Sequence, residues 1–262
     1  MSAFNSGAAY EPYVGRWSRV VAPAFVRWLD APPGIHWLDI GCGTGALSSA
    51  ILAGARPRAV SGVDRSAAFI AHAREQVDDD RLDLREGDAL ALPFDDGAFD
   101  ATVSGLVLNF LPDPNRGLAE MARVTRPGGI VAIYVWDYAG GMELMRYFWD
   151  TAVAIDPGAA AWDEGQRQTP LCRPDALARR FDEAGLVDVE TRAIDVPTVF
   201  RDLDDYWSPF LGGQGSAPTW VATLDDERRA ALRERLRANL PIDADGGIRL
   251  TARAWAARGR AA

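Results

Sequence analysis

The sequence contains no lysine, since its 28 positively charged residues are all arginines. Mechanisms that need a lysine are therefore excluded, among them a phosphate-binding P-loop lysine, a Schiff base and a lysine base. The sequence has only two histidines, His36 and His72, and two cysteines, Cys42 and Cys172. These numbers are too small for a zinc site or a disulfide framework. We expect no bound metal, and two free thiols in a reducing compartment.

Long apolar runs and basic segments are also missing. No stretch approaches the roughly 18 consecutive apolar residues of a membrane-spanning helix. Residues 1–10 carry neither the basic flank nor the apolar centre of a secretory signal, so we expect a cytoplasmic protein. The formal net charge of -9 argues against binding to nucleic acid, which needs a basic surface. The partner that these features favour is a small molecule; the sequence does not indicate the oligomeric state.

The first half of the chain alternates strands and helices. With 262 residues, 48% of them hydrophobic, the chain suits one compact α/β domain. Between residues 35 and 136 this alternation predicts a doubly wound, mostly parallel sheet with helices on both faces. The predicted strands are 37–40, 60–64, 81–86, 98–105 and 130–136, and the predicted helices are 46–53, 67–77 and one starting at Asp113-Pro114 and ending at 126–129.

The remaining residues come before and after this half in the sequence. Residues 1–34 contain a helical pattern over 18–30 and are predicted to form an N-terminal helix and lid. Residues 137–262 are predicted to complete the sheet, with an insertion over 196–247 that roofs the substrate pocket. Within them we predict helices over 142–155, 174–184 and 224–240, the last capped by Thr223, and strands over 186–194 and 248–255.

A glycine-rich turn follows the first predicted strand, in the segment Leu38–Gly45. Gly41, Gly43 and Gly45 allow a tight turn and a close approach of the backbone to a ligand, and Asp39 adds a carboxylate. The spacing of Gly41, Gly43 and Ala46 also fits a dinucleotide fingerprint. At this point both an oxidoreductase that binds NAD(P) and a different nucleoside cofactor remain open.

Two acidic residues at later strand ends extend the pattern. Asp64 ends the second strand, where a carboxylate accepts hydrogen bonds from the hydroxyl groups of a ribose. Asp88 and Ala89 follow the third strand and can bind an adenine, through the carboxylate and a backbone N–H group. Ligands of such sheets bind at the carboxyl ends of the strands, where the strand order reverses.

As a set, these segments resemble the methyltransferase type 11 family of class I methyltransferases, the ubiquinone and menaquinone C-methyltransferase-like group. The matching pieces are Leu38–Gly45, Asp64, Gly87-Asp88-Ala89, Leu92-Pro93-Phe94 to Phe99-Asp100, Asn109–Asp113 and Arg126-Pro127-Gly128-Gly129. The resemblance implies a Rossmann-like sheet of seven strands whose last strand is antiparallel. It also implies S-adenosyl-L-methionine as methyl donor, with S-adenosyl-L-homocysteine as product.

The resemblance implies which part of the cofactor each residue contacts. The glycine loop, with Asp39 and Cys42, holds the methionine part, Asp64 the ribose, and Asp88 and Ala89 the adenine. Ser104 and Gly105 line the side of the methyl group. We add Arg65, which follows Asp64, and Tyr13 and Arg16, whose side chains can fold over a ligand. These candidates are Tyr13, Arg16, Asp39, Gly41, Cys42, Gly43, Gly45, Asp64, Arg65, Asp88, Ala89, Ser104 and Gly105.

The predicted reaction is in-line displacement at the methyl group, catalysed mainly by positioning. Candidates for orienting or deprotonating the acceptor are Tyr13, Asn109, Asp137 and Tyr138. The aromatic residues Trp162, Trp207, Phe210 and Trp220 either line an apolar pocket or pack into a satellite core. Two other functions stay open: an NAD(P)-dependent oxidoreductase and a non-enzymatic module that binds S-adenosylmethionine.

Overall fold

A computed structural model describes residues 15–165, 170–212 and 215–262. One sheet of seven strands runs through it in the order β3-β2-β1-β4-β5-β7-β6. Its neighbouring strands are parallel except for β7, which is antiparallel to both β5 and β6. This confirms the predicted fold class. The strands are β1 (His36–Ile40), β2 (Ala59–Asp64), β3 (Leu82–Glu86), β4 (Phe99–Gly105), β5 (Thr125–Trp136), β6 (Val187–Phe200) and β7 (Ile248–Arg260).

The strand order reverses between β1 and β4. The chain moves from β1 through α3 (Ala46–Gly54), β2 and α4 (Ala67–Gln76) to β3, and then starts again at β4 on the other side of β1. Right-handed crossovers in opposite directions put α3 and α4 on one face, and α5 (Pro114–Val124) on the other. The point of reversal is where a ligand is expected.

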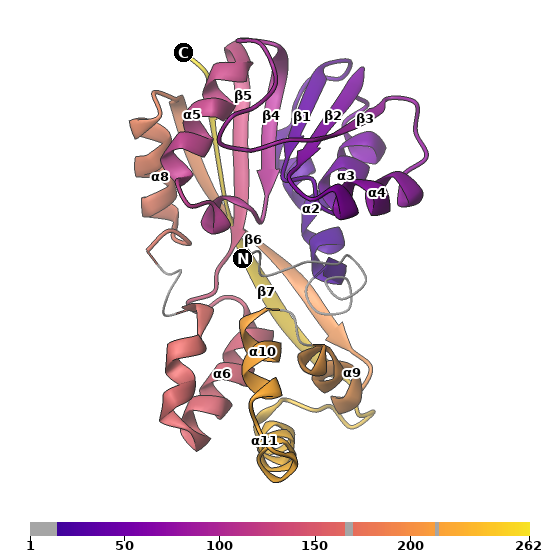
Figure 1. The fold of residues 1–262 in the computed structure, drawn as a ribbon, viewed down its shortest axis with the longest axis vertical. Helices are drawn as coiled ribbons and strands as arrows, with labels where there is room; N and C mark the ends of the chain where they lie inside the picture. The colour runs from indigo at the N-terminus through magenta and orange to yellow at the C-terminus, as the bar shows by residue number, and fades with distance from the viewer. Residues whose placement is uncertain (1–14, 166–169, 213–214) are drawn as a thin grey trace.

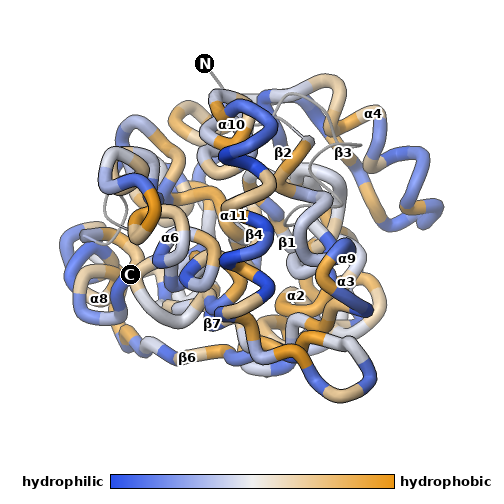
Figure 2. Tube along the Cα trace, turned by 90° about the horizontal axis from the view of Figure 1, so that it is seen from below, coloured by the Kyte–Doolittle hydropathy of each residue, from blue (hydrophilic) through white to orange (hydrophobic). Residues whose placement is uncertain are grey.

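Helices fill both faces. The N-terminal helix α2 (Arg16–Leu29) packs against α3, while α5 packs against α8 (Pro174–Glu183) (Figure 1). Arg258 of β7 fixes the end of α2, because its guanidinium donates to the carbonyl oxygens of Trp28 and Leu29 at 3.0 and 3.1 Å. Hydrophilic stretches, including those around α8 and α4, lie at the periphery in Figure 2. No helix in the described ranges is long and apolar enough to cross a membrane.

Three strands are longer than the sequence predicted. The segment Arg126–Gly129, expected to end the preceding helix, belongs to the start of β5, because Gly128 N–H donates to Ala261 O and Ala261 N–H to Gly129 O. β7 continues to Arg260 instead of 255, and β6 continues to Phe200 instead of 194. Cross-strand pairs such as Arg253 with Asp195 stabilise this long ladder. The insertion therefore starts at residue 201, not at 196.

A second lobe, formed by residues 143–162, 203–211 and 216–239, lies at the far end of β6 and β7 (Figure 1). It contains α6 (Glu143–Ile155), η3 (Pro157–Trp162), α9 (Leu203–Trp207), η4 (Ser208–Leu211), α10 (Ser216–Ala222) and α11 (Asp226–Asn239). α11 is capped by Asp225, whose carboxylate accepts from Arg228 N–H at 2.8 Å, and not by Thr223.

Aromatic side chains form the core of this lobe. Phe148 stacks on Phe210 with ring centroids 4.3 Å apart, and Trp220 lies 6.0 Å from Trp149. Trp207, Phe210 and Trp220 are buried. Of the two expectations for them, packing into a core is the one that the structure bears out, but they join the main hydrophobic core and not a separate satellite core. Trp162, in contrast, is 37% exposed.

Candidate functional site

A cavity of about 640 Å³ lies at the carboxyl edge of the sheet, beside the reversal between β1 and β4. Its size is typical of small-molecule sites. Its described lining comes from α2 and from the segments that follow β1, β2, β3, β4 and β5. Ten of the predicted site residues line it: Asp39, Gly41, Cys42, Gly43, Asp64, Arg65, Asp88, Ala89, Gly105 and Tyr138.

The glycine loop has the backbone that the sequence required. Gly41, Gly43 and Gly45 have φ angles of 68°, 52° and 85°, in the left-handed region where a side chain is strained. A Cβ atom on Gly41 would also collide with the side chain of Val107. Gly45 is the N-cap of α3 and does not line the cavity. The loop therefore presents bare backbone to the cavity, with α3 behind it.

Asp39 is buried at the base of the cavity, with 1% of its surface exposed. Its Oδ2 accepts from the Ser48 hydroxyl at 2.7 Å, whereas its Oδ1 has no partner among the described residues. Burial raises the pKa of Asp39 to about 7, against the lowering effect of the Ser48 hydrogen bonds. An unpartnered buried carboxylate oxygen in a cavity is suited to a cationic ligand.

Asp64 holds the glycine loop from the neighbouring strand. Its Oδ2 accepts from Gly43 N–H at 3.0 Å, and its Oδ1 accepts from Ser66 N–H at 2.8 Å. Burial raises the pKa of Asp64, and these two backbone hydrogen bonds oppose the shift. Each carboxylate oxygen keeps a second lone pair, so this fixed carboxylate can still accept from a diol.

The other two predicted polar groups differ in surroundings. Asp88 is exposed, and its Oδ1 accepts from Leu90 N–H at 2.9 Å, which leaves the second oxygen for a ligand. Cys42 is 5% exposed, and burial raises the pKa of its thiol well above the ordinary value. A protonated thiol is a poor nucleophile. Cys42 therefore lines the cavity as a small apolar residue.

Another part of the cavity lining is largely aromatic and aliphatic. It includes Val107, Phe110, Tyr134, Trp136 and Tyr138. The absence of a side chain at Gly105 makes room for this wall, because a Cβ atom there would lie 2.5 Å from the Tyr134 hydroxyl oxygen. Trp136 is 2% exposed, and its indole Nε1 has no hydrogen-bond partner in the described part of the chain.

The comparisons with known proteins bear directly on this cavity. A family profile described as "Methyltransferase domain" matches residues 38–133. A demethylmenaquinone methyltransferase of Halalkalibacterium halodurans is 32% identical over 64% of this chain and 74% of that protein. The chain belongs to the methyltransferase type 11 family. This membership confirms the predicted class, an S-adenosylmethionine-dependent methyltransferase, and speaks against an NAD(P)-dependent oxidoreductase.

Two further proteins resemble this methyltransferase. The 2-methyl-6-phytyl-1,4-hydroquinone methyltransferase of Synechocystis sp. is 31% identical over 73% of this chain, but the match spans only 60% of that relative. Phosphoethanolamine N-methyltransferase 2 of Haemonchus contortus, solved with S-adenosyl-L-methionine, has a TM-score of 0.56 at 18% identity, over 91% of this chain and 51% of that one. The structural likeness supports the fold.

The cavity of the methyltransferase fits S-adenosylmethionine. That cofactor carries two positive centres, an ammonium and a sulfonium, and the described lining offers Asp39, Asp64 and Asp88 against one arginine, Arg65. The orphaned Oδ1 of Asp39 suits the ammonium group. Buried or fixed carboxylates interact favourably with cations in such a site. The acidic lining thus matches the charge of the methyl donor.

Several predicted residues lie outside the cavity of the methyltransferase. Arg16 forms an ion pair with Asp205 at 3.2 Å, and its guanidinium lies over the rings of Trp17 and Phe200. Ser104 is buried, and its hydroxyl donates to Ile40 O at 2.7 Å. Both residues therefore support the fold, and neither contributes to the cavity lining.

Two of the residues that were expected to orient or deprotonate the acceptor also lie outside the lining of the main cavity. Asn109 lies in the short helix η2 (Leu108–Phe110) and is not among the cavity-lining residues. Asp137 borders a different cavity of about 340 Å³, and its Oδ1 accepts from Gly140 N–H at 3.3 Å. Tyr13 lies outside the described residues. No described residue of 201–247 lines the main cavity, so the roof assigned to the insertion stays a prediction.

Sequence reasoning missed most of the aromatic wall. Tyr134 and Trp136 belong to a run that reads as a buried strand, and Phe110 to a segment without clear periodicity. The one available signal is position: residues at the carboxyl end of a central parallel strand face the ligand edge. Ser104 and Gly105 on β4 were selected through the family resemblance, whereas position at the carboxyl end of β5 would have selected Tyr134 and Trp136.

Proposed function

We propose that this methyltransferase transfers the methyl group of S-adenosylmethionine to a hydroxylated aromatic ring. The observation that carries the proposal is Trp136, a buried indole donor without a partner in the described chain, set in an aromatic wall. An unpartnered buried donor costs about 1–3 kcal/mol, which an acceptor oxygen would recover. A flat ring with a hydroxyl group meets both the apolar wall and this donor.

The neighbours of Trp136 support the same substrate class. Tyr134 and Tyr138 add hydroxyl groups to the wall, and Val107 and Phe110 add apolar surface. Pockets of this composition bind apolar ligands and orient them with a few polar groups. Two relatives are named for quinone or hydroquinone substrates. Their names are consistent with a ring-shaped acceptor in this chain.

The chain acts mainly by positioning. When bound, S-adenosylmethionine supplies a methyl group on a positively charged sulfur, which an acceptor atom displaces in line. The glycine loop, Asp39 and Asp64 hold the methyl donor. The aromatic wall orients the ring of the acceptor. Neither histidine is among the described lining residues, and the Cys42 thiol stays protonated. Fixing two reactants in line can lower a barrier by several kcal/mol.

The test combines binding and turnover. Calorimetric titration with S-adenosylhomocysteine is expected to show binding, with NAD as a negative control. A methyl-labelled donor is then offered with a reduced naphthoquinone, a simple hydroquinone and phosphoethanolamine. Labelling of the first two alone supports the proposal. Labelling of phosphoethanolamine alone would refute the acceptor class, and binding without turnover of any acceptor would favour the non-enzymatic module.

A further inference from the structure

The segment 88–97, between β3 and β4, forms one end of the cofactor cavity. Asp88, Ala89 and Leu90 line the cavity, and the segment contains no helix and no named strand. Its own backbone supplies a single bridge, between Asp88 and Ala91. A segment with so few internal hydrogen bonds needs outside support to keep one conformation.

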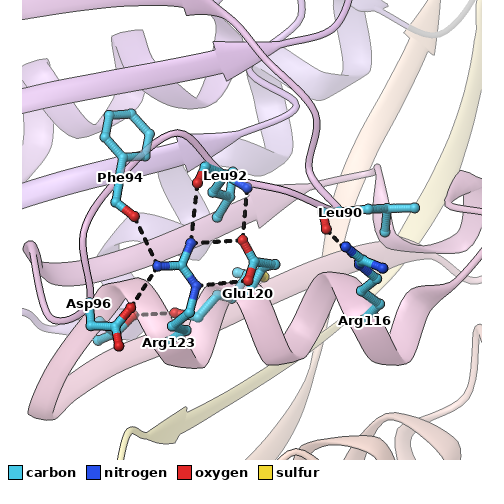
Figure 3. Close-up of polar contacts among 9 residues, drawn as sticks. Leu90, Leu92, Phe94, Asp96, Arg116, Glu120 and Arg123 are labelled. Atoms are coloured by element: carbon cyan, nitrogen blue, oxygen red, sulfur yellow. Dashed lines mark hydrogen bonds and ion pairs between the residues drawn. The ribbon is translucent and has the colours of Figure 1, made fainter.

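Arg123 on α5 supplies part of that support. Its guanidinium donates to the carbonyl oxygens of Leu92 and Phe94 at 3.2 and 2.9 Å, and to the Asp96 carboxylate at 2.7 Å (Figure 3). One side chain thus contacts three residues of the segment. The planar guanidinium is suited to this, because its donors have a fixed geometry.

Glu120 and Arg116, on the same helix, complete the support. Glu120 Oε2 accepts from Leu92 N–H at 2.8 Å, and both Glu120 oxygens accept from Arg123 at 2.8 Å. Arg116 donates through Nε to Leu90 O at 2.7 Å (Figure 3). Leu90 itself lines the cavity. We call Arg116, Glu120 and Arg123 the α5 clamp.

We propose that the α5 clamp positions the adenine side of the cofactor site, so that donor affinity depends on residues that do not line the cavity. This inference rests on the proposed binding of S-adenosylmethionine. Arg116 acts at Leu90, and the pair of Arg123 and Glu120 acts at Leu92, two residues further along. The clamp residues are positioning residues and have no direct role in methyl transfer.

The clamp keeps its charges over a wide pH range. Hydrogen bonds to Glu120 and Asp96 raise the pKa of Arg123, and the hydrogen bond from Arg123 lowers the pKa of Glu120. Both shifts favour the ionised forms that make these hydrogen bonds. Substitution is therefore the appropriate way to remove the clamp.

The test uses Arg116→Met and Arg123→Met, which keep the aliphatic stem and remove the donors. The matched control is Arg229→Met on α11. Arg229 also donates to two carbonyl oxygens, those of Val221 and Ala222, and to a carboxylate, and its side chain is 36% exposed against 32% for Arg123. Thermal unfolding and circular dichroism check that each variant is folded.

Two ligands distinguish an effect at the adenine end of the cofactor site from an effect at the methionine end. They are S-adenosylhomocysteine and 5′-methylthioadenosine, which lacks the amino-acid part. If loss of a clamp donor leaves about a tenth of the molecules with a competent adenine site, the dissociation constant rises about tenfold for both probes. Arg229→Met should leave both constants unchanged. With an acceptor in hand, KM for the donor should rise while kcat stays constant.

Three results would overturn the inference. The first is wild-type affinity for both probes in both folded clamp variants. The second is weaker binding of S-adenosylhomocysteine alone, which would assign the effect to the methionine end. The third is an equal loss of affinity in Arg229→Met, which would mark a general effect of stability. If the wild-type protein binds neither probe, the proposed function fails, and the clamp proposal fails with it.

Discussion

The replacement Asp39→Asn separates what Asp39 does for stability from what it does for binding. The pKa of Asp39 is raised from 3.8 to about 7 because the carboxyl is buried. Between these two values the native protein holds a proton that the unfolded chain releases. The free energy of unfolding therefore falls as the pH rises through this range. A pKa shift of about three units lowers the free energy of unfolding by about 4 kcal/mol once the pH is above 7.

Asparagine has nearly the same shape as aspartate and carries no charge. Its oxygen can accept the Ser48 hydrogen bond, and its amide nitrogen takes the place of the unpartnered Oδ1, so both proteins leave one polar atom unpartnered. We expect Asp39→Asn to match the wild type near pH 4 and to be more stable by up to about 4 kcal/mol at pH 8.

Urea denaturation of both proteins at several pH values measures this difference. Groups that titrate independently of Asp39 contribute equally in both proteins, so their contributions cancel in the comparison. A stability difference that does not change with pH, or a less stable variant at pH 8, would refute the reasoning. The same variant should bind S-adenosylhomocysteine at least about tenfold more weakly, because an amide N–H cannot pair with an ammonium group.

Three further substitutions test the two walls of the cavity. Asp64→Asn turns an amide donor toward Gly43 N–H or Ser66 N–H, and calorimetry should show S-adenosylhomocysteine binding weakened about tenfold or more. Gly105→Ala forces the Tyr134 hydroxyl away from a new Cβ atom, and thermal unfolding should show a loss of about 1–3 kcal/mol. Trp136→Phe removes a buried donor that has no partner among the described residues, together with some packing. Urea denaturation should therefore show a change in the free energy of unfolding within about 1 kcal/mol. A loss of stability above about 3 kcal/mol would contradict the absence of a hydrogen-bond partner.

The residues of the donor half of the site could be predicted because they depend on local backbone conformation and on position at strand ends. Gly41 and Gly43 adopt the left-handed φ angles that only glycine tolerates easily, so their identity points to the turn. Asp39 is the last residue but one of β1 and Asp64 is the last residue of β2, and parallel strands share one ligand edge. The mostly parallel sheet followed from the alternation of strands and helices, and its seven strands with an antiparallel last strand followed from the family resemblance.

The acceptor half could not be predicted in the same way. Tyr134 and Trp136 belong to an apolar strand, where packing and ligand contact have the same sequence pattern. Asp137 comes one residue later and lies in a different cavity. Arg16 was expected at the ligand but pairs with Asp205, 189 positions further along the chain. Contacts of that range are set by the tertiary fold, and no local pattern records them.

The unequal strand lengths have a consequence for how this protein can diversify. β5 ends at Trp136, opposite Ala254. Before that residue β6 is the one named strand that pairs with β7 among the described residues, and isolated bridges join β7 to Met142 and Ile242. This part of β6 and β7 forms an arm that leads to the second lobe, which lies below the rest of the sheet in Figure 1. Insertions and substitutions at its far end can accumulate without disturbing the glycine loop. Selection can act on one end of the molecule while the other stays unchanged.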